Sequence, residues 1–123
     1  MKIKKYDPLT DEEYMSVEMK EHFYDMLNEK LDFESHQVKE LNEIALQANK
    51  EADIYDQAGI ENDRALAVVK RDRHNESILE CKKSLVLLDK NDYGYCECGE
   101  EVGIKRLIFN PSLKKCFDCA SLD

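Results

Sequence analysis

The fold is decided by the stretch from Ser16 to Lys50, which reads SVEMKEHFYDMLNEKLDFESHQVKELNEIALQANK. It contains neither Gly nor Pro, and the next such residue is Gly59. Apolar residues recur in it at alternating steps of three and four if Glu34 takes one seam position: Leu27, Leu31, Val38, Leu41, Ala45 and Ala48. This spacing is that of a coiled-coil stripe with one polar interruption. Because Ser16 is a favourable N-cap, we predict a helix over residues 17–47, on the order of 45 Å long.

A second helix is predicted over residues 61–89. Its apolar positions are Ala65, Val68, Val69, Ile78, Leu79, Leu85 and Leu88. The charged run from Lys70 to Glu76 weakens this stripe in the middle. Two long helices joined by about a dozen residues must fold back antiparallel, because each has to bury its stripe. The fold class is therefore mainly α, a long antiparallel helical hairpin of coiled-coil type with its tip near residues 50–60.

Composition changes close to Asp92, where Gly and Cys become frequent. We therefore predict three parts: an N-terminal segment over residues 1–15, the hairpin over 16–91 and a small cysteine-rich module over 92–123. Cys96-Glu97-Cys98 is followed by Cys116-Phe117-Asp118-Cys119. Two cysteine pairs separated by a hairpin-sized loop are typical of a zinc ribbon, with one structural Zn²⁺ held by Cys96, Cys98, Cys116 and Cys119.

The first cysteine pair has only one intervening residue. Tetrahedral sulfur ligands about 2.3 Å from zinc are roughly 3.8 Å apart, whereas alternate residues of a strand are about 6.6 Å apart. The backbone at Glu97 must therefore bend sharply, and Gly99 helps it to do so. The alternative is that this pair has lost the metal or holds it with fewer ligands. We expect the remaining cysteine, Cys81, to be a small buried or half-buried residue of the second helix. The minor alternative is that it is a spare metal ligand or a redox partner.

Composition also excludes several classes of protein. The net charge of -9, from 27 acidic and 18 basic residues, disfavours binding to free DNA. A basic group in the ribbon leaves a nucleic-acid-binding module as a minor alternative: Lys105, Arg106, Lys114 and Lys115. We find no signal peptide and no apolar run of about 18–20 residues, which predicts a cytoplasmic protein without membrane contact.

No catalytic constellation stands out in the sequence. A phosphate-binding glycine loop and a nucleophile elbow are both missing, and His22, His36 and His74 are far apart in charged surroundings. We interpret the histidines as ordinary surface residues, and we expect no enzymatic activity. Asp53 and Asp56 lie where the hairpin turns. Judged by pattern alone, they are a capping and turn device.

Taken together, these segments resemble the DksA/TraR zinc-finger regulators of bacterial RNA polymerase. The tip is similar to the family's Asp-x-x-Asp-x-Ala motif at Asp53, Asp56 and Ala58. The resemblance runs from about residue 12 to the end and includes Glu12-Glu13-Tyr14-Met15, His22-Phe23, Arg71-Asp72-Arg73, Asp92-Tyr93-Gly94-Tyr95, Gly103-Ile104-Lys105-Arg106-Leu107, Pro111 and both cysteine pairs.

The resemblance implies a monomeric regulator that binds RNA polymerase and reads no DNA sequence. Its hairpin would enter the secondary channel, the ribbon would hold the rim, and initiation or open-complex stability would change. Carried over by position, Asp53 and Asp56 would approach the catalytic region, with Ala58 packing at the tip. Arg71 and Arg73 are possible polymerase contacts.

The sequence departs from the family in two ways. The first cysteine pair is one residue short, which leaves open a redox- or metal-responsive interaction protein as the alternative function. Members that respond to the alarmone guanosine tetraphosphate, in the stringent response, carry basic side chains where this chain has Glu80, Asn110 and Ala120. Because cationic groups are lost there, we expect weak or absent dependence on the alarmone.

Overall fold

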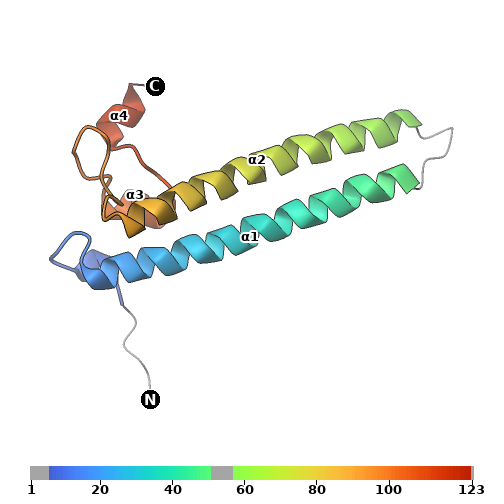
Figure 1. Cartoon of the computed structure of the whole chain (residues 1–123). Helices are drawn as coiled ribbons and strands as arrows, with labels where there is room; N and C mark the ends of the chain where they lie inside the picture. Colours follow the sequence, from blue (N-terminus) through green and yellow to red (C-terminus); the bar gives the residue numbers. More distant parts are fainter. Residues whose placement is uncertain (1–5, 51–56, 123) are drawn as a thin grey trace, which may run out of the picture. The chain divides into compact units, whose positions relative to one another are not determined.

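The computed structural model describes residues 6–50 and 57–122, and its elements are almost all helical. A short 3₁₀ turn, η1 (Pro8–Thr10), precedes two long helices, α1 (Val17–Lys50) and α2 (Gln57–Asp89). Two short helices follow, α3 (Ile104–Phe109) and α4 (Phe117–Ser121) (Figure 1). In these residues no strand forms, and β pairing is limited to one antiparallel bridge between Tyr95 and Glu101. The predicted class, mainly α with two paired long helices, is confirmed.

Two compact units divide the chain. Unit 1 comprises Met1–Lys30 and Glu80–Asp123, and unit 2 comprises Leu31–Leu79. Each unit therefore contains a stretch of α1 and a stretch of α2, which run side by side in opposite directions (Figure 1). The units cut across the predicted hairpin and ribbon, and that three-part division remains a prediction.

The start of α1 follows from its cap. Ser16 Oγ accepts a hydrogen bond from the backbone N–H of Met19 at 3.2 Å, as expected of an N-cap. The same hydroxyl donates to Asp11, whose carboxylate also accepts from Tyr6 O–H at 2.7 Å. Hydrogen bonds from Ser16 and Tyr6 hold the pKa of Asp11 below its usual range. The predicted start of this helix is confirmed.

The start of α2 was predicted wrongly. This helix begins at Gln57, not Glu61, and includes Gly59, which is exposed. Glycine in a helix costs only about 1 kcal/mol relative to alanine, so one exposed glycine does not stop a long helix. The chain between the two helices is shorter than predicted as a result.

Unit 1 contains the main core. Met19, Phe23 and Leu27 lie four residues apart on α1 and are fully buried. They share the core with two side chains of α2, Cys81 and Ser84, which confirms that Cys81 is a buried residue. Phe23 also packs against Tyr93 with ring centroids 5.8 Å apart. Burial of each large apolar side chain contributes about 1.5–3 kcal/mol, which makes unit 1 the more strongly packed part of the chain.

Unit 2 has a thinner seam. Of its described residues, only Glu34 and Ala67 are buried, and the other inward side chains are half-buried. A carboxylate thus lies in the most protected part of this seam.

Gly94 connects α2 to the cysteine-rich module in a close-packed turn. Its φ of 89° is in the left-handed region. A Cβ at this position would lie 2.7 Å from Met15 Cε and 3.0 Å from Tyr14 Oη. The left-handed conformation therefore favours glycine here, and an added Cβ would also displace the Met15 side chain.

Gly94→Ala should destabilise the protein by about 2–3 kcal/mol, because it adds left-handed strain and a steric clash. Gly59→Ala is the matched control. No atom lies within 4 Å of its added Cβ, and it should stabilise the exposed turn of α2 by about 0.5–1 kcal/mol. Thermal unfolding followed by circular dichroism measures both. Equal effects of the two substitutions would contradict this account of Gly94.

Candidate functional site

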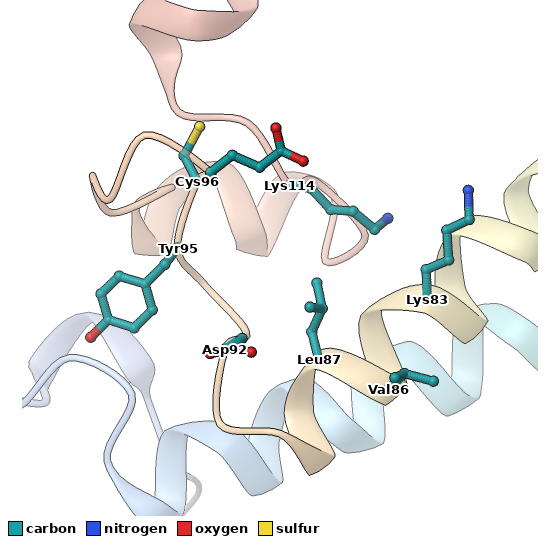
Figure 2. Close-up of a pocket in the computed structure, with 8 residues that line it drawn as sticks. Lys83, Val86, Leu87, Asp92, Tyr95, Cys96 and Lys114 are labelled. Carbon is teal, nitrogen blue, oxygen red and sulfur yellow. The ribbon is translucent and has the colours of Figure 1, made fainter.

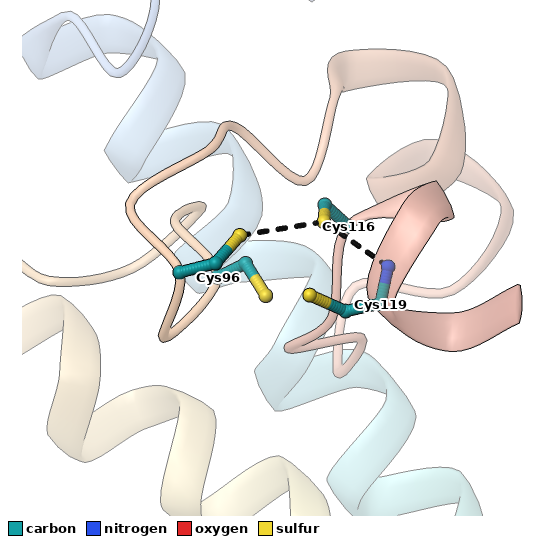
Figure 3. A group of neighbouring side chains, drawn as sticks. Cys96, Cys116 and Cys119 are labelled. Carbon is teal, nitrogen blue, oxygen red and sulfur yellow. Dashed lines mark hydrogen bonds between the residues drawn. The ribbon is translucent and has the colours of Figure 1, made fainter. Parts of the chain in front are cut away.

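Four cysteines form one cluster in unit 1. The sulfur atoms of Cys96, Cys98, Cys116 and Cys119 all lie within 4.8 Å of one another. The Sγ atoms of Cys98 and Cys116 are 3.6 Å apart, close to the roughly 3.8 Å edge of a tetrahedral zinc–thiolate site. Figure 3 shows the sulfurs of Cys96, Cys116 and Cys119 converging on a common centre. The structure thus brings together all four predicted ligands.

Local backbone geometry explains how the short first pair converges. Cys96 N–H donates to the carbonyl of Glu100 at 2.8 Å, and Gly99 N–H donates back to the carbonyl of Cys96 at 2.9 Å. Gly99 closes this turn with a φ of 93°, which agrees with the predicted bend after Glu97. The chain reverses within the pair, so two sulfurs separated by one residue still face the same point.

The second pair is held by a helix start. Cys116 is the N-cap of α4, and its Sγ accepts from the backbone N–H of Cys119 at 3.5 Å. This arrangement places the sulfur of Cys119 one turn later on the same side as that of Cys116. The helical turn thus directs the thiol of Cys119 into the cluster, although two residues separate it from Cys116.

The electrostatics of the cluster favour a cation. Backbone hydrogen bonds from Cys116 and Cys98 lower the pKa of Cys96 to about 6, which favours its thiolate. Hydrogen bonds with the side chains of Cys116, Cys96 and Cys98 raise the pKa of Cys119, because its protonated thiol donates them. Four thiolates this close together would also repel one another. A divalent cation at the centre would relieve that repulsion. Four sulfurs fit a closed structural zinc site, with no position for a reacting water.

Tyrosine hydroxyls brace the cysteine-rich module internally and fasten it to the segment that precedes α1. Tyr14 O–H donates to the carbonyl of Gly94 at 2.6 Å and accepts from the backbone N–H of Gly103 at 3.2 Å. Tyr93 O–H donates to the carbonyl of Pro111 at 2.6 Å, and burial raises its pKa. Buried, satisfied hydroxyls of this kind fix the module's orientation within unit 1.

Two lysines clamp the segment from Asn110 to Lys114 between the long helices. From α1, Lys30 Nζ donates to Asn110 Oδ1 at 2.7 Å. Lys114 Nζ reaches α2 and lies 2.6 Å from Glu80 Oε2. The hydrogen bond from Lys114 lowers the pKa of Glu80. The cysteine cluster is therefore tied to both helices by side chains adjacent to it.

Open cavities flank this clamp. One of about 640 Å³ is lined by Lys83 and Val86 of α2 and by Tyr95 and Lys114 of the cysteine-rich module (Figure 2). A neighbouring cavity of about 530 Å³ brings together the three positions that lack a basic side chain, which are Glu80, Asn110 and Ala120. Arg106 lines it too, but its guanidinium donates to the carbonyl of Lys115 at 3.0 Å. Much of the cationic charge here is already engaged within the chain.

The predicted tip falls largely outside the described residues. Asp53 and Asp56 lie outside the described residues. Ala58 belongs to the first turn of α2, and its side chain is likewise outside them. Of the two predicted arginine contacts, Arg73 is exposed. Arg71 is half-buried and donates to Asn42 Oδ1 at 3.3 Å.

One contact was missed by the sequence interpretation. His74 Nδ1 of α2 contacts Glu34 Oε2 of α1 inside the seam of unit 2. His74 is thus only half-buried, but it has a partner on the other helix that the sequence interpretation does not include. The sequence does contain a signal for this contact. Glu34 interrupts the apolar stripe of the first helix, and the charged run that contains His74 interrupts the stripe of the second. His36 does behave as expected, in an exposed pair with Glu40.

Known proteins resemble this chain along nearly its whole length. The RNA polymerase-binding transcription factor DksA of Haemophilus influenzae is 34% identical over 125 residues, covering 98% of this chain and 84% of that protein. The protein of the same name from Escherichia coli K12 is 32% identical over 125 residues, covering 98% of this chain and 81% of that protein. The chain belongs to the DksA family.

A solved structure has a similar fold. The transcription factor DksA2 from Pseudomonas aeruginosa superposes with a TM-score of 0.86 at 22% identity, covering 91% of this chain and 88% of that chain, which supports the fold. No family model matches the sequence. The names of these DksA proteins do not favour the alternative of a redox- or metal-responsive switch. Among the described residues, no helix combines the length and apolar character needed to cross a membrane.

We expect this DksA-family protein, purified under reducing conditions, to contain about one zinc ion per chain. Cys116→Ser should lose most of the zinc and lower the Tm, because metal binding stabilises only the folded module. Cys81→Ala removes a buried thiol outside the cluster and should keep the metal. Elemental mass spectrometry measures zinc in these three proteins and in Cys98→Ser. Wild type that takes up no zinc from excess metal would contradict the assignment, and full retention by Cys98→Ser would favour a three-ligand site.

Proposed function

We propose that this protein is a cytoplasmic, non-enzymatic regulator of transcription that binds bacterial RNA polymerase and alters initiation. The observation that carries the proposal is near full-length similarity to DksA proteins whose names state RNA polymerase binding. The paired helices and the four-cysteine cluster agree with it. The structural ion at that cluster is Zn²⁺, and the protein acts as a monomer without reading DNA sequence.

Entry through the secondary channel of the polymerase is the mode of action that we propose. A helix of 34 residues, the length of α1, extends about 50 Å at 1.5 Å per residue. Elements of this length can carry side chains deep into a pore. Asp53, Asp56 and Ala58 lie at the connection between the two helices and would be the residues delivered to the catalytic region.

The carboxylates of Asp53 and Asp56 would produce the effect of this insertion on the open complex. Near the catalytic Mg²⁺ or basic residues of the polymerase, Asp53 and Asp56 would change the local field that holds the open complex together. Two unit charges about 4 Å apart interact by about 1 kcal/mol in water and about 4 kcal/mol near a protein surface. Because about 1.4 kcal/mol changes a rate tenfold, two added carboxylates are sufficient to alter open-complex lifetime.

The cysteine-rich module would hold the rim of the channel, and Arg71 and Arg73 would contact the polymerase along the inserted helix. Unit 1 suits a gripping role because its module is fastened by Tyr14, Lys30 and Lys114. Binding free DNA through the ribbon cations is less favourable. Glu80 neutralises Lys114, and the chain has a net charge of -9.

Asp56→Asn should preserve polymerase binding and reduce the effect on open-complex lifetime by about tenfold, because a charge is removed while shape is kept. Asp63→Asn, an exposed carboxylate of α2, is the matched control and should leave the effect intact. Pull-down of core polymerase measures binding, and promoter-complex decay measures lifetime. Unchanged decay with Asp56→Asn would refute the assignment of the tip, and absence of polymerase binding by wild type would refute the function.

We further propose that guanosine tetraphosphate contributes little through the cavity at Glu80, Asn110 and Ala120. Pyrophosphate groups require cations, and none of these three positions supplies one. The nearby Lys114 ammonium is engaged by the Glu80 carboxylate and by the carbonyl of Ser112 at 3.0 Å. The acidic partner would also repel a phosphate.

In a promoter transcription assay, we expect wild-type protein to act with less than about twofold enhancement by the alarmone. The combined variant Glu80→Lys, Asn110→Arg and Ala120→Lys should gain alarmone dependence, because it adds three cations to one cavity. Lys82→Arg, which preserves charge on an exposed face of α2, serves as the control. Strong synergy with the wild-type protein would overturn this proposal.

A further inference from the structure

The first pair of cysteines is carried by the first cysteine loop, which comprises residues 94–103. Backbone hydrogen bonds join the two arms of this loop. Cys96 N–H donates to the carbonyl of Glu100 at 2.8 Å, and Val102 N–H donates to the carbonyl of Gly94 at 2.8 Å. Alternate residues of an extended chain lie about 6.6 Å apart, and only one residue separates these two cysteines. Their sulfurs therefore converge only while the loop stays closed.

The base of this loop is closed by a side chain from outside the cysteine-rich module. Tyr14 O–H donates to the Gly94 carbonyl at 2.6 Å, and the same oxygen accepts from Gly103 N–H at 3.2 Å. Because Gly94 and Gly103 are the two ends of the loop, one hydroxyl joins both arms. The Tyr14 ring also packs edge-on against Tyr95, with ring centroids 5.5 Å apart. A residue that is 80 positions from Gly94 in the sequence thus holds the loop together.

Tyr14 is held in place by the segment that contains it. The Asp11 carboxylate accepts hydrogen bonds from the hydroxyls of Tyr6 and Ser16, and η1 lies against α3. Met15 is buried and packs against the turn that leads into the module. An ordered side chain loses little further conformational entropy when it forms hydrogen bonds, so Tyr14 is well suited to fix the shape of the loop.

We propose that Tyr14 is a positioning residue for the metal site, whose hydroxyl holds the first cysteine loop in the shape that brings Cys96 and Cys98 together. Tyr14 acts through the backbone of Gly94 and Gly103, and it is not itself a ligand. Without the hydroxyl, Gly103 N–H loses this acceptor and the two arms are no longer joined at their ends. Residues that orient metal ligands in this way typically contribute about 10–100-fold to metal affinity.

The second pair of cysteines is positioned by other contacts. Cys116 is the N-cap of α4, and Cys119 lies in the first turn of that helix. The segment before this pair is braced by Tyr93, whose hydroxyl donates to the carbonyl of Pro111 at 2.6 Å. Loss of the Tyr14 hydroxyl should therefore disturb one pair of ligands and leave the other pair in place.

Coupling between the Tyr14 hydroxyl and the metal has to be reciprocal, because it is a difference in free energy shared by two sites. If a closed loop strengthens metal binding, then a bound metal keeps the loop closed and holds Tyr14 in place. Loss of the metal should consequently loosen residues 10–16 as well as the module. The influence of the cysteine cluster would then extend to Ser16, the N-cap of α1.

The decisive variant is Tyr14→Phe, which removes the hydroxyl and keeps the ring, so that the helical content should be close to that of wild type. Competition with a chromophoric chelator should give a zinc affinity about tenfold weaker than that of wild type. The variant loaded with Co²⁺ should also show shifted visible d–d bands, because two of its four thiolates leave the tetrahedral arrangement. Wild-type zinc affinity combined with unchanged Co²⁺ bands would overturn the proposal.

Tyr6→Phe is the matched control. It removes a hydroxyl from the same segment, but one that donates to Asp11 and not to the first cysteine loop. This variant should keep the zinc affinity and the Co²⁺ bands of wild type. A loss of affinity equal to that of Tyr14→Phe would show that the general stability of the segment matters, and it would contradict a positioning role for Tyr14.

Hydrogen exchange on the wild-type protein tests the reciprocal effect without any substitution. Removal of zinc should speed exchange several-fold at the amides of Thr10, Asp11 and Ser16, which are hydrogen-bonded within the segment. The amides of residues 23–27, in the core of α1, serve as the reference and should change less. Exchange at the three amides that does not depend on zinc would overturn the proposal, and this measurement decides the question if Tyr14→Phe fails to fold.

Discussion

Pairing of the two long helices is the interaction on which the rest of the structure depends. Neither helix can bury its apolar stripe alone, and Met19, Phe23 and Leu27 are fully buried only because the stretch of α2 around Cys81 lies against them. The cysteine-rich module is built onto this pair. Its clamp residues reach Lys30 on one helix and Glu80 on the other, so the four-cysteine cluster is held by the hairpin as well as by its own turns.

Much of this arrangement could be predicted from sequence, because the signals are local or periodic. Ser16 is followed by a helix since its hydroxyl caps that helix, and the four thiols converge since their spacing and Gly99 permit a tight turn. Gly59 was misleading, because glycine was read as a breaker although an exposed glycine costs a helix little. The partner of Glu34 could not be predicted either, because it depends on how two distant segments align.

Unit 1 shows how the structure accommodates two departures of this chain from the family pattern. A one-residue cysteine spacer is compatible with a four-sulfur site because the chain reverses between Cys96 and Glu100. The loss of basic residues at Asn110 and Ala120 is accompanied by an internal ion pair, Glu80 with Lys114. This ion pair fastens the cysteine-rich module to α2.

The two units are therefore held together by different interactions. Unit 1 has a dense core, hydrogen-bonded tyrosine hydroxyls and the four-cysteine cluster, so its shape rests on several interactions at once. Unit 2 buries little apolar area, and Glu34 and Ala67 are the only buried residues among those the structure describes there. A buried carboxylate that lacks a partner is costly. Glu34 meets that requirement through its contact with His74 on the other helix, so a satisfied polar pair occupies the most protected position of this seam.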